Sequence, residues 1–111
     1  MSIAAFGELG AIMSQLASTL DRYEADSARM VGTWFDMDLY SEVSAEIDEI
    51  QRYSVSLPGI SVAAAAVLIA HCEVVYTLWR NADVQDVQRE HTACIESLRK
   101  ACRHRLAPAN G

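Results

Sequence analysis

His71 and His91, two histidines in apolar surroundings, are the side chains of this chain best placed to carry chemistry. An exposed imidazole can accept a phosphoryl group or move a proton. Val74 and Val75 lie near His71 on the same predicted helix, and Glu73 lies beside them. A developing phosphoryl anion requires hydrogen-bond donors or cations, which these neighbours do not supply. The pattern therefore favours a hydrogen-bonded histidine in the core.

His91 and Cys94 are three residues apart, so a helix would bring them close enough to bind one metal ion. Cys102 lies two turns beyond Cys94, too far to join them within one helix. A closed zinc site would need two further ligands. We therefore predict no metal site and interpret Cys94 and Cys102 as small core residues.

A row of acidic residues follows one face of another predicted helix: Asp38, Glu42, Glu46 and Glu49. Ferritin-like di-iron bundles carry a Glu-x-x-His pair, and the chain has none, so we interpret the row as a solvated acidic face. The sequence also contains no nucleophile elbow, no glycine-rich phosphate loop and no recognisable Ser/His/Asp grouping. We predict that the protein is not an enzyme and has no catalytic residues and no cofactor.

Composition narrows the class of protein further. The 111 residues are 51% hydrophobic with a net charge of −6, which predicts one domain, residues 1–111, with a buried core. The negative charge argues against non-specific binding to nucleic acid or to anionic lipid. Three cysteines without CxxC spacing and an N-terminal segment without Lys or Arg favour a cytoplasmic protein with reduced thiols. The longest apolar run, 62–70, is shorter than the roughly 20 residues that span a bilayer, so no membrane span is predicted.

The elements that would position these side chains begin with a long amphipathic helix over 3–31. Its apolar residues recur at alternating intervals of three and four, which is the spacing of a coiled-coil seam. We expect this seam to mediate self-association, most simply in a homodimer, through Phe6, Leu9, Met13, Leu16, Leu20 and Tyr23.

Three further helices are predicted over 37–53, 60–80 and 84–105, followed by a frayed tail at 107–111. Asp36 and Asp83 are suited to cap the second and fourth helices. The third helix is apolar on nearly every face, so we expect it at the centre of the fold. The fold class is therefore all-α, either a four-helix bundle or paired helical hairpins that complete each other in a dimer.

The turn Leu57-Pro58-Gly59-Ile60-Ser61 resembles the hairpin of the helix-hairpin-helix DNA-binding family, which has an L-P-G-I-G turn. The resemblance covers about residues 47–70 and implies contact between backbone amides and a phosphate. Ser61 replaces the second glycine, and the turn contains no Lys or Arg. A nucleic-acid-binding regulator that uses this turn, or the basic end of the fourth helix, as its contact is thus one alternative. The other interpretation is a plain helix–helix turn in which Gly59 adopts a positive φ.

The leading hypothesis is a small acidic protein-binding module, in the manner of an adaptor, a secretion chaperone or an inhibitor, that acts through helix-mediated contact with another protein. Methionine and aromatic residues gather where the first helix meets the second and form the predicted partner contact: Met30, Trp34, Phe35 and Met37. A second alternative is phosphoryl transfer through His71, because a four-helix architecture with a mid-helix histidine resembles a histidine phosphotransfer bundle.

Overall fold

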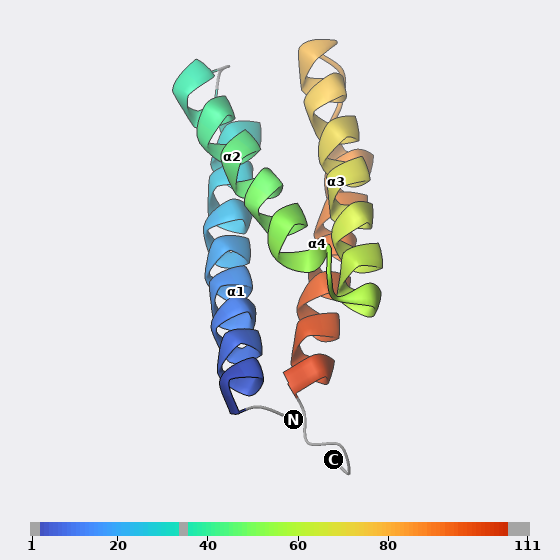
Figure 1. The fold of residues 1–111 in the computed structure, drawn as a ribbon. Coiled ribbons are helices and arrows are strands. Elements are labelled where there is room, and N and C mark those ends of the chain that lie inside the picture. Colours follow the sequence, from blue (N-terminus) through green and yellow to red (C-terminus); the bar gives the residue numbers. More distant parts are fainter. Residues whose placement is uncertain (1–2, 34–35, 107–111) are drawn as a thin grey trace.

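Four helices make up the fold in a computed structural model that describes residues 3–33 and 36–106 (Figure 1). They are α1 (Ile3–Gly32), α2 (Met37–Ser54), α3 (Pro58–Trp79) and α4 (Gln85–Leu106). The all-helical prediction is confirmed, and each helix boundary lies within two residues of the predicted one. The tail over 107–111 lies outside the described residues.

The helix starts follow from local chemistry. The Asp36 side chain accepts hydrogen bonds from the backbone amides of Asp38 and Leu39 and so caps α2. Asp83 likewise accepts from the amide of Gln85 at 2.9 Å, at the start of α4. Both predicted caps are confirmed.

The turn before α3 differs from the prediction. Pro58 is the first residue of α3, where its missing N–H costs no helical hydrogen bond. Gly59 is therefore already helical, and no glycine with a positive φ occurs among the described residues. The helix begins two residues earlier than expected because proline fixes a φ that suits the first turn of a helix.

The helices form two antiparallel hairpins that lie side by side (Figure 1). One hairpin pairs α1 with α2, and the other pairs α3 with α4. The hairpins meet mainly where α2 packs against α3, and to a lesser extent where α4 packs against α1. The result is an elongated molecule with principal extents of 52 × 26 × 18 Å.

The apolar seam of α1 lies inside this single chain. Met13, Leu16, Leu20 and Tyr23 are at most 1% exposed, and they belong to the same core as residues of α2, α3 and α4. The predicted self-association surface therefore has no free face at these four residues. Leu9 is half-buried at the edge of the core, and the side chain of Phe6 lies outside the described part of the chain.

The position of α3 also differs from the prediction. Its inner face packs on α4 and α2, but several large apolar residues on the opposite side are exposed, so α3 is not enclosed on all sides. By length and composition α3 could cross a membrane, with a mean hydropathy of 1.8, and 33% of that stretch is buried in the fold. A helix that is apolar all round can find partners for only one side in a pair of hairpins, which leaves its other side in water.

Candidate functional site

The polar centre of the bundle is a buried cluster in which Tyr23 of α1 contacts His71 of α3 and His91 of α4. The Tyr23 hydroxyl lies 2.8 Å from Nδ1 of His71 and 2.6 Å from Nε2 of His91. A hydroxyl carries one hydrogen, so it donates to one imidazole and accepts an N–H from the other. The cluster connects three helices from both hairpins.

Burial sets the protonation of this centre. It lowers the pKa of His91 to about 4, with a further lowering from His71 that Glu24 partly offsets. It also lowers the pKa of His71, against a raising influence of Asp48. The pKa of the Tyr23 hydroxyl is raised, first by burial and then by nearby acidic groups. All three groups are therefore neutral at pH 7, which is the form that can share hydrogen bonds without a buried charge.

This geometry bears directly on the phosphotransfer hypothesis. His71 is only 6% exposed, and its Nδ1 is engaged by Tyr23. A phosphoryl donor needs open access to an imidazole nitrogen, so the arrangement gives the hypothesis no support. The interpretation of His71 as a hydrogen-bonded core residue is confirmed.

The cysteines form no ligand set. Among the residues that the structure describes, no three His, Cys, Asp or Glu side chains converge in a way that could hold a metal ion. Cys102 is buried and Cys94 half-buried, as expected for core residues, and burial raises the pKa of both thiols. A raised thiol pKa keeps sulfur protonated and weakly nucleophilic.

Glu46 is the exception in the predicted acidic face. It is 9% exposed, and its Oε1 has no hydrogen-bond partner in the described structure. Burial and a hydrogen bond with the carboxyl group of Asp26 raise the pKa of Glu46 to about 7. The sequence did contain a signal, because Glu46 lies three residues after Val43 and beside Ile47, both of which are in the core.

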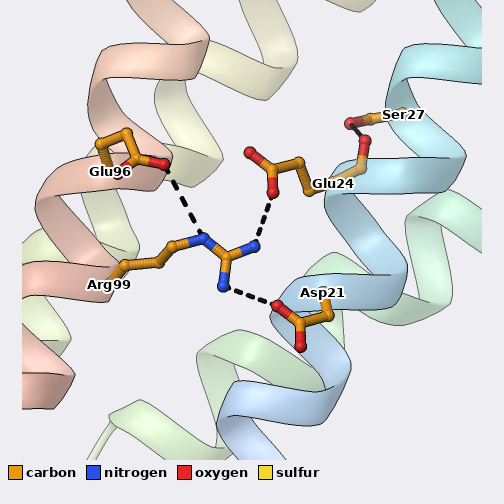
Figure 2. Close-up of polar contacts among 5 residues, drawn as sticks. All are labelled: Asp21, Glu24, Ser27, Glu96 and Arg99. Carbon is orange, nitrogen blue, oxygen red and sulfur yellow. Dashed lines mark hydrogen bonds and ion pairs between the residues drawn. The ribbon is translucent and has the colours of Figure 1, made fainter.

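Arg99 of α4 joins the two hairpins on the surface (Figure 2). Its guanidinium group contacts Asp21 and Glu24 of α1, each at 2.6 Å, and lies 3.9 Å from Glu96 on its own helix. The forked geometry of arginine allows two carboxylates to be bound at once. The described contacts of this basic residue are thus with α1 and α4.

The turn between α2 and α3 borders a hollow of about 540 Å³. Gly59 and Ile60 line one side of it, and Ser97, Lys100 and His104 of α4 line the other. Lys100 and His104 come from the C-terminal part of α4, which the nucleic-acid hypothesis named as an alternative contact to the turn. Nucleic-acid binding at this turn stays a prediction, and it requires an affinity that falls steeply as salt rises.

The predicted partner contact is only partly placed. Met37 is 64% exposed and can meet a partner, whereas Met30 is buried in the core. A hollow of about 510 Å³, lined by Met30 and Tyr40 among others, lies between the end of α1 and the end of α3. Trp34 and Phe35 lie outside the described residues.

The outer side of α3 carries the feature that sequence reasoning missed. Exposed residues recur there at intervals of three and four along the whole helix. We call this set the outer stripe; it consists of Val62, Ala65, Ile69, Cys72, Tyr76 and Trp79. Its four large side chains are 62–73% exposed. The spacing is visible in the sequence, but a helix that is apolar on nearly every face predicts a fully buried helix. The sequence alone did not indicate that one apolar face of α3 is exposed.

No protein-family model, curated protein or solved structure matches the chain, so the interpretation of these sites is based on their geometry and chemistry.

Proposed function

We propose that this protein is a helical protein-binding module whose contact surface is the outer stripe of α3. The supporting observation is the continuous exposure of large apolar side chains along one helix face. Soluble proteins rarely leave a contiguous apolar patch in water unless it meets a partner. Two of the side chains, Tyr76 and Trp79, are of the types that contribute most to binding energy at interfaces.

The mode of action is helix-against-groove or helix-against-helix recognition. Anchors spaced by three and four residues lie on one side of α3, and a helical partner reads such a pattern by inserting its own apolar side chains between them. The buried centre of Tyr23, His71 and His91 supports this surface indirectly, because it ties the inner face of α3 to α1 and α4. In this proposal the polar cluster holds the scaffold and the outer stripe binds.

Site-specific photo-crosslinking tests the proposal. A photoreactive benzophenone amino acid at position 69 in the host cell should yield a covalent adduct with a protein. The same amino acid at Arg89, whose side chain is 76% exposed on α4, is the matched control and should yield none. Equal adducts at both positions, or no adduct at position 69, would contradict the proposal.

A further inference from the structure

The outer stripe has a spacing that reads the same in both directions along α3. Its successive intervals are three, four, three, four and three residues. When two such helices pack antiparallel, every stripe residue of one can face a stripe residue of the other. The matching layers are Val62 with Trp79, Ala65 with Tyr76, and Ile69 with Cys72. Each of these layers occurs twice, on either side of a two-fold axis between residues 70 and 71.

From this match we infer that the outer stripe is covered by the outer stripe of a second copy of this chain, with the two α3 helices antiparallel. The inference rests on the proposed function, since it names the partner of that surface. The contact is isologous, because the same patch serves on both sides of a two-fold axis, and such contacts close into dimers.

Side-chain size favours the antiparallel orientation. Each antiparallel layer pairs a smaller residue with a larger one, as in Ala65 against Tyr76, so the distance between the helices stays even along their length. A parallel pair would instead place Trp79 against Trp79 at one end and Ala65 against Ala65 near the other. That arrangement crowds four aromatic rings at one end and leaves space at the opposite end.

The available area suits a weak but specific dimer. Tyr76 and Trp79 are 62% and 70% exposed, and Val62 and Ile69 are 73% and 63% exposed. Burying the stripes of two copies would remove on the order of 1,000 Å² from water, since aromatic side chains alone bury about 150–250 Å² each. This value is at the lower limit for specific interfaces, so we expect a weak dimer that forms at micromolar or higher concentrations.

Charge sets the salt dependence of this contact. The stripe itself carries no charge, and Arg80 lies over the ring of Tyr76 at 4.8 Å, next to the stripe. Each copy has a net charge of −6, so two copies repel each other at long range. Added salt screens that repulsion and strengthens the dimer, whereas nucleic-acid binding weakens as salt rises.

Analytical ultracentrifugation of the full chain between 1 and 200 μM is the first test. We expect a monomer–dimer equilibrium that shifts toward dimer with salt and is weakened at least tenfold by Ile69→Glu. Ala25→Glu, on an exposed face of α1, is the control and should leave the equilibrium unchanged. Circular dichroism confirms that both variants are folded.

Disulfide trapping tests the orientation. In a Cys72→Ser, Cys94→Ala, Cys102→Ala background, one version carries Ala65→Cys and a second carries Tyr76→Cys. The antiparallel layers predict that oxidation joins the two versions when they are mixed and joins neither one to itself. A parallel dimer predicts the reverse, because like residues then face each other, and cysteines whose Cα atoms lie more than about 7 Å apart do not bridge.

The outcomes separate this inference from the proposed function. A monomer at all concentrations, with a photo-adduct to a different protein at position 69, would overturn the second copy and leave the binding surface standing. A dimer that is insensitive to Ile69→Glu would overturn the inference in the same way. Co-sedimentation of the wild type, but not of Ile69→Glu, with neutral phosphatidylcholine vesicles would make lipid the occupant and overturn both.

Discussion

The seam of α1 and the outer stripe of α3 share the same alternating intervals of three and four residues, yet one is buried and the other is exposed. Leu16 in the seam is 0% exposed, whereas Ile69 in the stripe is 63% exposed. Periodicity thus predicts that a helix has an apolar face, but not which element covers it. In this fold α2, α3 and α4 contribute to the core that encloses the seam, whereas the large side chains of the outer stripe are exposed.

The two helices differ in what surrounds the apolar face. Helix α1 is polar elsewhere, with exposed residues such as Gln15 and Arg22, so its single apolar face is the one that turns inward. Helix α3 has apolar residues on both sides, and its inner side alone supplies enough of them to pack on α4 and α2. The outer stripe consists of the apolar residues of α3 that this packing does not use.

The largest effect is expected when one residue of the seam and one residue of the outer stripe are each replaced by alanine. Leu16→Ala should lower the free energy of unfolding by about 3 kcal/mol, because it opens a cavity in the core. Ile69→Ala should change it by less than about 0.5 kcal/mol in dilute monomer, because its side chain is already in water. Urea denaturation at 1 μM measures both. Similar losses in the two variants would show that the outer stripe is packed within the chain.

A matched pair of tyrosine substitutions should have the next largest effect. Tyr23→Phe should destabilise the fold by about 2 kcal/mol, because it leaves two buried imidazole nitrogens without their partner. Tyr76→Phe in the outer stripe should leave stability unchanged, since its hydroxyl is not needed by the core. Thermal unfolding followed by circular dichroism separates them. If Tyr23→Phe unfolds at the same temperature as the wild type, the hydrogen bonds of the buried cluster do not stabilise the packing of the helices.

The smallest effect concerns pH. The pKa of His91 falls from 6.5 when unfolded to about 4 when folded, so the unfolded chain binds more protons in this range and stability falls as pH drops. Glu46 acts in the opposite sense, because its pKa rises from 4.5 to about 7 and stability therefore rises as pH drops. The Glu46 carboxyl therefore offsets part of the stability that the two histidines lose between pH 4.5 and 6.5.

Glu46→Gln should expose the contribution of the histidines. On acidification across the same range, this variant should lose about 1 kcal/mol per pH unit more than the wild type. Equal slopes of stability against pH in the wild type and in Glu46→Gln would show that Glu46 does not offset the buried histidines.

Sequence reasoning predicted the helices, the two aspartate caps and the buried histidine because each depends on local spacing or on a single capping side chain. It could not place Tyr23 between His71 and His91, since that contact joins residues 48 and 68 positions apart. The heptad spacing assigned Tyr23 to the apolar self-association seam. Such spacing shows on which face of the helix a side chain lies, but not which group its hydroxyl contacts. The exposed side of α3 was missed for a similar reason: enclosure depends on how many helices surround it.

The contact of Arg99 with Asp21 and Glu24 has a consequence for how the helices slide against each other. The apolar residues of a coiled-coil seam repeat every seven residues, so a shift of one helix along the other by about 10.5 Å brings apolar residues together again. Hydrophobic packing alone therefore allows more than one axial register. The Arg99 guanidinium group binds two carboxylates that are one helical turn apart, and it can reach both of them in one register only. Arg99 therefore fixes the axial register of α4 against α1, because it stabilises one of the registers that the apolar core would allow.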